Sequence, residues 1–483
     1  MEQNNEIQVG VYLSKDWLCL LALALFVFLL IFPVFYFGIP NGADFPQHYQ
    51  FAFTYLESIK SGNFLPGWSP SNNYGFGEVG IRFYPPLAHY CLALTQLLTG
   101  DWYLTSWLNV LFWMLLGSLG IYLWAREWLS PQNSLWVGIL YAVAPYHLSQ
   151  FYQYFLYSEY VAAGILPFCF FYLTRVIRDG KFKNVLGLGF SSALLILSHI
   201  PTTIIGVICL GLYAILILDW KKLTKIIPLL FISGVLAVSS TAFYWSKLIT
   251  EIGLVNHSNP KYASSYSVAY FPMIFHSTEY YFSKQMWYKD LVSISAILFI
   301  LPLIVFLFWQ RKKSTQDLSQ KKYYLAVLLT GIFAFFMSSH LSSFIWDNIS
   351  FLQRLQFPFR WLSVATLMGV MCFVIGLRQL SFTNNISNNL KKYAVVIFLF
   401  GIFLFDVSQV ILPSETLPRP QFEERLNGLG DQESFDCWWT VWSKSEAFNN
   451  REKVSALSRQ VSITRWNAEE REFEIEAGTS QNV

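Results

Sequence analysis

Long apolar segments recur along most of the chain, and each approaches the length of about 20 residues that a helix needs to cross a lipid bilayer. We expect eleven of them to cross, several by extending into their flanks. They are Trp17–Phe37, Tyr103–Ala125, Ser134–Gln150, Tyr160–Thr174, Asn184–Ser198, Pro201–Leu218, Ile226–Trp245, Leu291–Trp309, Tyr323–Met337, Trp361–Leu377 and Tyr393–Leu412. The sequence therefore predicts an all-α polytopic membrane protein with about 11 transmembrane helices.

Composition excludes the main classes of soluble protein. Only 13% of the 483 residues are charged and 54% are hydrophobic, whereas soluble domains carry about 25% charged residues. The 33 basic and 30 acidic residues nearly balance, which is unlike the basic surface of a nucleic-acid-binding protein. The six cysteines form no Cys-x-x-Cys pair, so the sequence indicates neither a disulfide framework nor a cysteine zinc site.

Basic residues cluster in alternate loops, and loops rich in lysine and arginine face the cytoplasm. The cluster positions are Arg126; Arg175, Arg178, Lys181 and Lys183; Lys221, Lys222 and Lys225; Arg311, Lys312, Lys313, Lys321 and Lys322; and Arg378, Lys391 and Lys392. The alternation requires Pro85–Thr99, which is too short to cross, to lie on the outer side as an interfacial helix. No cleavage site follows the first segment, so we expect it to stay as an anchor. The prediction is a multi-pass protein of the inner (plasma) membrane with a cytoplasmic N-terminus and an outer C-terminus.

This topology divides the chain into a membrane domain, residues 1–412, and an extracytoplasmic tail, residues 413–483. The outer loops of the membrane domain are 38–102, 246–290 and 338–360. In the tail, Val461–Trp466 and Glu472–Glu476 alternate apolar and polar residues around a turn, which predicts a β-hairpin. Two strands alone are marginally stable, so this hairpin needs further strands or a longer domain around it.

All seven histidines fall in outer loops or at outer helix ends under the predicted topology. They are His48, His89, His147, His199, His257, His276 and His340. Such a one-sided distribution favours an active site at the outer boundary of the membrane. Histidines at helix ends are also ordinary interface residues, so this alternative stays open.

The first outer loop contains the densest group of candidate residues. Asp44 is placed to cap a helix with Pro46 in its first turn. His48 follows four residues later, on the same helical face. An Asp and a His so placed can share a divalent metal ion or act as a base and its orienting partner. In the alternative interpretation Asp44 only caps the helix and His48 only faces water.

A second group of candidates lies at the outer ends of later segments. A carboxylate at membrane depth is costly and marks a functional candidate, which applies to Glu159. His147 follows a helix-breaking Pro145, and His199 occupies a tight turn where a helix cap is the alternative role.

The third group of candidates consists mainly of arginines. A guanidinium offers a planar fork of hydrogen-bond donors that suits phosphate. Arg360 lies at the outer mouth of a segment, with Arg354 and Gln356 shortly before it. Arg82 and His89 flank a turn-rich part of the first loop. The alternative is that these arginines reach toward the membrane interface or pair with lipid headgroups.

These motifs occur together in one family. They are, in order, Asp44–His48, Pro85-Pro86-Leu87, Pro145-Tyr146-His147 followed by Glu159, Ser198-His199, and Gln356-Phe357-Pro358-Phe359-Arg360. Over roughly residues 15 to 412 the chain resembles the YfhO-like polytopic membrane proteins, the so-called 6-pyruvoyl-tetrahydropterin synthase-related membrane proteins. These proteins are similar to the GT-C glycosyltransferases. Nothing in the sequence offers the soluble zinc domain of a pterin synthase.

The resemblance implies a GT-C-like fold and transfer of a sugar from a polyprenyl-phosphate-linked donor to an acceptor on the outer face. By that analogy Asp44 is the acid or base of the first loop or a metal ligand, and Arg360 binds the lipid phosphate. Together with the arguments from spacing and membrane depth above, the predicted catalytic residues are Asp44, His48 and Glu159, with a divalent metal as a candidate cofactor at Asp44 and His48. The residues that would bind substrate or phosphate are Arg82, His89, His147, His199, Arg354, Gln356 and Arg360. The chain departs from the family in Tyr152–Tyr157, where other members often carry an arginine before the acid.

Two other classes of function stay open. A transporter or flippase of a lipid-linked glycan would also have many spans, but transporters often show internal repeats and polar groups at the membrane midplane. The sequence shows no repeat, and its candidates gather at the outer face. A non-catalytic accessory membrane protein is the third class, which the altered stretch before Glu159 keeps open. In every case the partners are membrane lipids and not nucleic acids.

Overall fold

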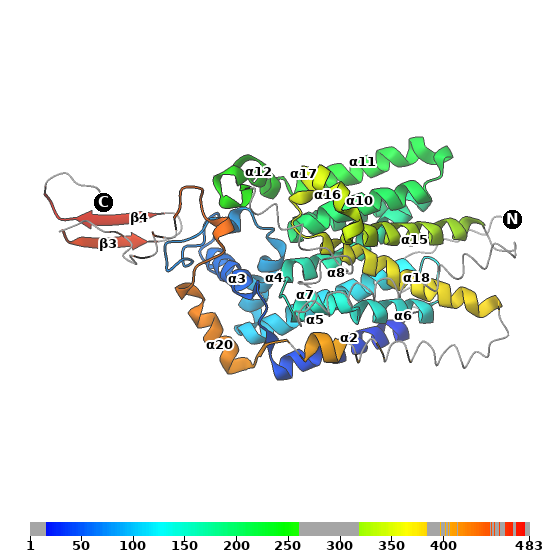
Figure 1. Cartoon of the computed structure of the whole chain (residues 1–483), viewed down its shortest axis with the longest axis horizontal. Coiled ribbons are helices and arrows are strands. Elements are labelled where there is room, and N and C mark those ends of the chain that lie inside the picture. The colour runs from blue at the N-terminus through cyan, green and yellow to red at the C-terminus, as the bar shows by residue number, and fades with distance from the viewer. Residues whose placement is uncertain are drawn as a thin grey trace.

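The computed structural model describes residues 16–259, 318–383 and, with short gaps, 397–478. Long helices form one bundle, and shorter helices gather at one of its ends (Figure 1). The long helices are α2 (Trp17–Phe37), α5 (Trp102–Ala125), α8 (Tyr157–Asp179), α9 (Phe182–Ser198), α10 (Ile200–Ile217), α11 (Leu223–Ser240), α15 (Leu318–Ser338) and α18 (Leu362–Thr383). Among the described residues seven helical segments are long and apolar enough to cross a membrane, and α9 is an apolar helix just below that length. The membrane-protein prediction is thereby supported by length and composition.

Two predicted segments differ in the structure. Ser134–Gln150 is divided into α6 (Pro131–Ala142) and α7 (Pro145–Tyr152), because Pro145 has no N–H group to continue the α6 ladder. Ile226–Trp245 is divided after Ser240, and α12 (Ala242–Glu251) begins there. The predicted segment Leu291–Trp309 and half of Tyr393–Leu412 lie outside the described residues, so the number of eleven stays a prediction.

Helix α8 forms the centre of the bundle and packs against α5, α9 and α10. Of the residues in its most apolar stretch, 89% are buried. Gly164 of α8 faces Gly117 of α5, where an added Cβ would lie 3.1 Å from the Gly164 Cα. Small residues at this contact let the two backbones approach, as is usual between transmembrane helices. Residues at the ends of α8 are therefore fixed by a well-packed element.

Helices α2 and α11 lie at the periphery of the bundle. Only 22% of the residues in the most apolar stretch of α2 are buried, and only 17% of those in the segment Trp220–Ser240 that contains α11. Apolar side chains such as Leu18, Leu21 and Phe231 are more than half exposed on them. Large exposed apolar surfaces on long helices fit contact with lipid chains.

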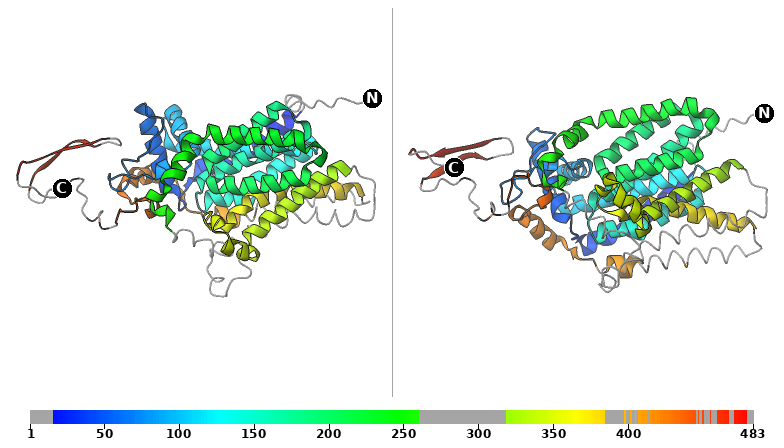
Figure 2. Two further views of the ribbon diagram at one scale, coloured as in Figure 1. Left: turned by 90° about the horizontal axis from the view of Figure 1, so that it is seen from above. Right: turned by 45° about the horizontal axis from the view of Figure 1, so that its top comes forward.

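The shorter helices α3 (Phe45–Lys60), α4 (Leu87–Thr99), α12 and α20 (Arg419–Asn427) lie together beyond one end of the bundle (Figures 1 and 2). We call these four helices, with the connecting segments 61–86, 252–259 and 428–443, the crown. The 13-residue α4 corresponds to the segment Pro85–Thr99, which the sequence predicts not to cross the membrane.

Further short elements are η1 (Gly80–Arg82), η2 (Trp220–Lys222), η3 (Ile252–Leu254), η4 (Asn256–Ser258), η6 (His340–Ser342), α16 (Ser343–Asn348), α17 (Ser350–Gln353), η7 (Pro358–Trp361), η8 (Asp406–Ile411), η9 (Gly428–Asp431) and η10 (Asp436–Trp438).

The start of the tail pairs with the start of the first loop in a short sheet that the sequence did not predict. Strand β1 (Ile39–Pro40) pairs antiparallel with β2 (Thr416–Leu417). Gly38 precedes β1 with φ +130°, and a Cβ there would lie 2.5 Å from the Leu417 carbonyl carbon, so only glycine permits this approach. Phe422 of α20 then packs its ring against Phe45 and Tyr49 of α3.

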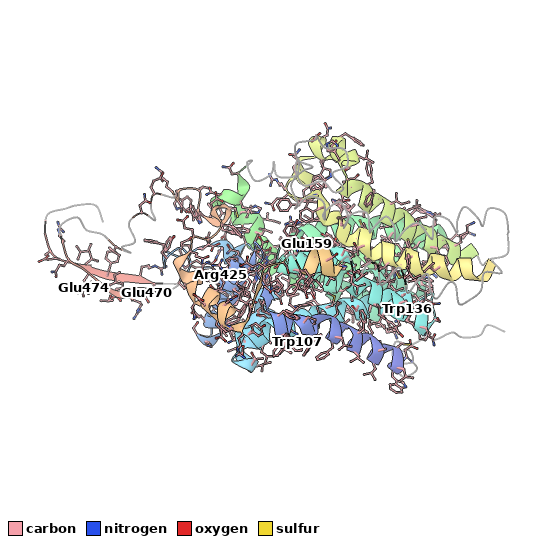
Figure 3. All side chains as sticks on the ribbon, turned by 60° about the horizontal axis from the view of Figure 1, so that its bottom comes forward. Trp107, Trp136, Glu159, Arg425, Glu470 and Glu474 are labelled. Carbon is pink, nitrogen blue, oxygen red and sulfur yellow. The ribbon has the colours of Figure 1, made fainter. Side chains whose placement is uncertain are left out.

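The predicted β-hairpin is confirmed. Strands β3 (Val461–Trp466) and β4 (Arg471–Ile475) pair antiparallel, with Ile463 opposite Phe473. The hairpin projects from the crown, whereas Glu159 lies among the helices (Figure 3).

Buried ion pairs hold the other end of the bundle, where α2 begins and α5 and α8 end. We call this the far end. Asp16 accepts hydrogen bonds from Tyr122 and Arg126 at 2.9 and 2.5 Å. Glu127 pairs with Arg175 at 3.2 Å and also with Arg178. Three arginines that the sequence places in basic loops thus join α2, α5 and α8.

Candidate active site at the crown end of the bundle

Glu159 lies in the first turn of α8 and is 2% exposed. Its Oε1 accepts hydrogen bonds from the Tyr146 hydroxyl at 2.6 Å and the Gln150 amide at 2.7 Å. These two residues are four apart on α7 and so share one face of the helix that Pro145 starts. The break in the helix therefore provides the donors that hold a buried carboxylate.

Arg360 approaches the same carboxylate from η7, with its Nε 3.4 Å from Glu159 Oε2. Its Nη1 donates to the Leu355 carbonyl at 2.7 Å, and its guanidinium carbon lies 4.7 Å from the centre of the Phe357 ring. Gln356 turns the chain in this segment with φ +66°. A guanidinium has five N–H donors, so this anchoring leaves Arg360 able to bind a further anion.

Asp44 occupies the predicted N-cap position of α3, but its carboxylate makes no cap hydrogen bond. Burial raises the pKa of Asp44 to about 6, although the Arg360 guanidinium lowers it, and the Glu159 carboxylate raises it further. Asp44, Glu159 and Arg360 therefore lie within electrostatic reach of one another. They come from the first loop, the start of α8 and the segment before α18.

The loop that carries Asp44 is pressed against the segment before Glu159. The Asp44 N–H donates to the Tyr154 carbonyl at 3.2 Å. A Cβ on Gly42 would lie 2.3 Å from the Tyr154 carbonyl carbon, and Phe155 has φ +54°. The stretch Tyr152–Tyr157 thus supports the Asp44 loop.

His48 and His89 form a buried pair in which His48 Nδ1 lies 3.0 Å from His89 Nε2. Burial lowers the pKa of His89 to about 3 and that of His48 well below its ordinary value, so both rings are neutral. The backbone of Pro85 bonds the His89 ring, and a proline backbone offers only a carbonyl. The other His89 nitrogen must therefore carry its proton, and His89 Nε2 accepts from His48.

This chain of hydrogen bonds leaves His48 Nε2 as a bare acceptor. The atom is buried and has no hydrogen-bond partner. The rings of Tyr84, Phe155 and Tyr157 surround His48. An unused acceptor in an aromatic wall is suited to a substrate hydroxyl, because an unpaired buried polar atom otherwise costs about 1–3 kcal/mol.

His199 and His147 lie near this cluster. Burial lowers the pKa of His199, with Arg360 and His48 lowering it further, which places the three side chains close together. The His199 side chain also accepts from the Thr202 N–H, so its role as a cap of α10 is confirmed. His147 is buried, and its ring centre lies 4.2 Å from that of Tyr141.

Other predicted residues lie differently. Arg82 pairs with Glu251 of α12, with Nη2 to Oε1 at 2.8 Å, and this ion pair competes with a phosphate-binding role. Arg354 is exposed and Gln356 partly exposed. His257 stacks on Trp438 at 4.8 Å. His276 lies outside the described residues.

The sequence did not predict the role of Glu78, which is 2% exposed in the crown. Gln47 and Asn72 donate to its carboxylate at 3.3 and 2.5 Å, and burial raises its pKa to about 7. Tyr146 and Gln150 were also missed, although their spacing after Pro145 is a signal that could have identified them.

A divalent metal ion finds an incomplete set of ligands here. Among the described residues no three His, Cys, Asp or Glu side chains are placed to hold one. Asp44 and His48 supply two donors, and His48 uses Nδ1 for His89. The donor set does not fit a metal site, and no chemical step below is assigned to a metal.

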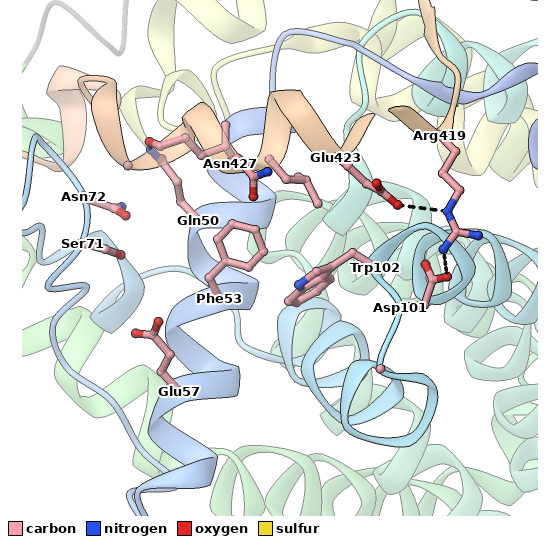
Figure 4. Close-up of a pocket in the computed structure, with 14 residues that line it drawn as sticks. Gln50, Phe53, Glu57, Ser71, Asn72, Asp101, Trp102, Arg419, Glu423 and Asn427 are labelled. Carbon is pink, nitrogen blue, oxygen red and sulfur yellow. Dashed lines mark hydrogen bonds and ion pairs between the residues drawn. The ribbon is translucent and has the colours of Figure 1, made fainter. Parts of the chain in front are cut away.

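A pocket of about 500 Å³ lies elsewhere in the crown, between α3 and α20 (Figure 4). Its lining residues are Gln50, Phe53, Glu57, Ser71, Asn72, Gly100, Asp101, Trp102, Arg419, Glu423, Leu426, Asn427, Leu429 and Gly430. We call Asp44, His48, Glu159 and Arg360 the Asp44 cluster; Asp44 and His48 lie at the start of α3, which also lines the pocket, but no residue of the cluster is among the lining residues.

Residues 81–411 match the model of the 6-pyruvoyl-tetrahydropterin synthase related domain, which is described as a membrane protein. An uncharacterized protein of Lactococcus lactis subsp. cremoris (strain MG1363) is 27% identical over 255 residues, which cover 50% of this chain and 41% of that protein. The chain thus matches less than half of the length of this relative.

Solved structures with a similar fold are membrane glycosyltransferases of the GT-C class. The archaeal oligosaccharyltransferase AglB from Archaeoglobus fulgidus, in complex with an inhibitory peptide and a dolichol-phosphate, has a TM-score of 0.53 and 11% identity. The match covers 90% of this chain and 62% of AglB. ArnT from Cupriavidus metallidurans, bound to undecaprenyl phosphate, has a TM-score of 0.49 and 16% identity over 86% of this chain and 75% of ArnT. The likeness to AglB confirms the predicted GT-C-like fold.

Proposed function

The chain belongs to the family of 6-pyruvoyl-tetrahydropterin synthase related membrane proteins, and on that premise we propose that it is an integral membrane glycosyltransferase. It transfers a sugar from a polyprenyl-phosphate-linked donor to an acceptor hydroxyl at the crown end of the bundle. In this proposal the crown faces the outside of the inner (plasma) membrane and the N-terminus lies in the cytoplasm. The observation that carries the proposal is the convergence of Asp44, Glu159 and Arg360 from three distant segments.

The position of Arg360 supports a lipid-linked donor. A polyprenyl chain keeps its phosphate at the membrane boundary, and Arg360 is the third residue of the candidate span Pro358–Leu377, at one end of that span. The AglB structure that shares the fold was solved with a dolichol-phosphate. We assign the donor phosphate to Arg360, with Glu159 as the residue that orients the guanidinium through its ion pair.

The transfer step needs a proton acceptor and a stabilised leaving group. The acceptor oxygen attacks the anomeric carbon, the bond from that carbon to the phosphate oxygen breaks, and the hydroxyl proton passes to a base. Asp44 with a pKa of about 6 is mostly ionised at neutral pH and still basic enough to take this proton. Arg360 stabilises the negative charge that remains on the polyprenyl phosphate.

The test uses purified protein in nanodiscs with a panel of undecaprenyl-phosphate monosaccharides. Mass spectrometry follows the release of undecaprenyl phosphate and the appearance of a glycosylated acceptor. We expect one donor to be consumed by the wild-type protein and Asp44→Asn to lose about 100- to 10,000-fold in rate. Glu424→Gln, which neutralises an exposed carboxylate of the crown, is the matched control and should keep the wild-type rate. Wild-type turnover by Asp44→Asn, or no donor consumed, would contradict the proposal.

A further inference from the structure

We propose that the pocket between α3 and α20 binds a neutral saccharide. Four separate parts of the chain line it: one side of α3, residues 71–72, the junction of α4 and α5, and α20 with η9. Figure 4 shows the rings of Phe53 and Trp102 on its floor and the polar side chains around them. Binding in this pocket stands apart from the transfer reaction, and only its use as an acceptor site rests on the proposed function.

An aromatic surface provides the apolar part of the pocket. The rings of Phe53 and Trp102 meet edge to face with centres 4.8 Å apart, and both remain partly exposed. The C–H face of a sugar ring is apolar and packs well on such rings, which have a large contact area and few rotatable bonds. A charged or flexible polar chain would gain little from this surface.

The polar lining matches vicinal hydroxyl groups. Asn427 contributes an exposed carboxamide, which both donates and accepts hydrogen bonds. Gln50 and Asn72 also line the pocket, but they are 3% and 1% exposed and their amides donate to the Leu429 carbonyl and to Glu78. Glu57 adds a carboxylate, which accepts only, and it is exposed on α3. A ligand that carries many hydroxyls can pair with both kinds of group.

The charge of the lining selects against anions. Arg419 is the one lysine or arginine among the lining residues, and it pairs with both Asp101 and Glu423. Glu57 is a third carboxylate, so the lining has more negative than positive charges. A phosphate or a uronic acid would meet net repulsion there, whereas a neutral saccharide would not.

The pocket exists because the tail folds back over the first loop. Gln50 donates from its amide to the Leu429 carbonyl at 2.9 Å, which joins α3 to η9. Asp101 at the start of α5 joins α20 through Arg419. These contacts bring the two sides of the pocket together without filling it.

The pocket is placed to hold an acceptor that reaches Asp44. Gln50 follows Asp44 by six residues, which corresponds to about 9 Å along α3. A short saccharide can bridge such a distance, so one sugar can occupy the pocket while a neighbouring hydroxyl reaches the Asp44 cluster. The pocket would then select the acceptor, and the cluster would carry out the reaction.

The test measures binding without any donor. Protein in nanodiscs is titrated with maltotetraose, cellotetraose, chitotetraose and tetragalacturonate, and binding is followed by saturation-transfer NMR and calorimetry. We expect at least one neutral oligosaccharide to bind and tetragalacturonate to bind more weakly than that ligand. Trp102→Ala should weaken binding about tenfold or more, because a buried aromatic anchor contributes at least about 1.4 kcal/mol.

Two further variants keep the test decisive. Asn427→Ala changes an exposed residue of α20, so it should fold and should still weaken binding. Trp442→Ala removes a tryptophan that is 66% exposed in the crown but outside the pocket, and it should bind as the wild type does. The proposal is overturned if no neutral oligosaccharide binds, if tetragalacturonate is preferred, or if Asn427→Ala and Trp102→Ala both bind like the wild type. The binding assay contains no donor, so its outcome is independent of transfer, and failure of the pocket is distinguished from failure of the transfer reaction.

Discussion

The two ends of the bundle bury arginines and carboxylates in different ways. At the far end, Asp16 and Glu127 each contact at least one guanidinium directly, at distances of 3.2 Å or less. Within the site at the crown end, Asp44 and Glu159 share the field of Arg360, whose Nε lies 3.4 Å from Glu159 Oε2. His48 Nε2 adds a buried acceptor without a partner. At the far end each of the two carboxylates has its own guanidinium partner and the ion pairs join helices, whereas at the crown end one guanidinium serves two carboxylates beside the neutral His48.

Removing a carboxylate at the far end should have the largest effect, and the effect should be on stability. Glu127→Ala leaves Arg175 and Arg178 without this partner, and Arg175 is 1% exposed. Breaking a buried ion pair on one side costs about 3–5 kcal/mol. We expect a marked fall in the melting temperature of protein in detergent. Glu423→Ala, which breaks an exposed pair on α20, is the control and should cost about 0–1 kcal/mol; similar losses for both variants would remove the contrast between the ends.

Removing the crown arginine should mainly affect turnover. Arg360→Ala should slow transfer about 100- to 1,000-fold, because it removes the group that stabilises the leaving phosphate. Arg360→Lys keeps the charge but loses the planar fork, so it should be impaired less. The rates are measured with saturating donor and equal amounts of folded protein. Equal activity of the wild type and Arg360→Ala would show that the crown end does not bind the donor phosphate.

Neutralising Asp44 should stabilise the protein while it lowers the rate of transfer. Burial raises the pKa of Asp44 from 3.8 to about 6, so the folded state holds the proton more tightly than the unfolded state does. The ionised carboxylate therefore costs stability at neutral pH. This cost declines as the pH falls from about 6 to about 4, and it is absent below that range, where both states are protonated. We expect Asp44→Asn to gain about 1–2 kcal/mol at pH 7, allowing for its partial exposure. Melting curves at pH 4 and pH 7 check the sign; a loss of stability at pH 7 would contradict it.

The smallest effect concerns the histidine pair. His89→Leu removes the acceptor for His48 Nδ1, so His48 can no longer be held with a bare Nε2. The loss of one such bond corresponds to about a tenfold fall in kcat/KM. His89→Gln places an oxygen near the lost nitrogen and should restore most of the rate. Nitrogen-15 NMR of labelled histidine, assigned with His48→Gln, should show an unprotonated His48 Nε2 in the wild type, and a protonated one would refute the hydrogen-bond direction.

The sequence predicts elements that depend on local pattern. The apolar segments, the β-hairpin and the start of α3 at Asp44 follow from segment length, alternation and capping chemistry. Pairings between distant residues were missed, since no local pattern records them. His48 meets His89 and Arg82 meets Glu251 only after folding. For the same reason Arg126 reads as a loop charge in the sequence but pairs with Asp16 in the structure.

The tail shows the same limit. Its hairpin alternates clearly in the sequence, whereas the return of α20 onto α3 depends on Phe422, Leu429 and Arg419, which form no recognisable motif. The pocket in the crown was therefore not predicted. Glu159 was predicted as a candidate because a carboxylate at membrane depth is costly. Asp44 was predicted from its spacing to His48, and Arg360 because a guanidinium suits phosphate; these arguments need no knowledge of distant partners.

The pH dependence of transfer tests the central claim most directly, namely that Asp44 at the crown end accepts the proton of the acceptor hydroxyl. The kcat/KM of the wild type is measured across pH values on both sides of about 6, together with the residual rate of Asp44→Asn. We predict that kcat/KM of the wild type falls about tenfold per pH unit on the acid side of the Asp44 pKa, since only the ionised carboxylate acts as a base. We predict that this acid limb disappears in Asp44→Asn. A wild-type profile that is flat through this range, or an acid limb that persists in Asp44→Asn, would contradict the account.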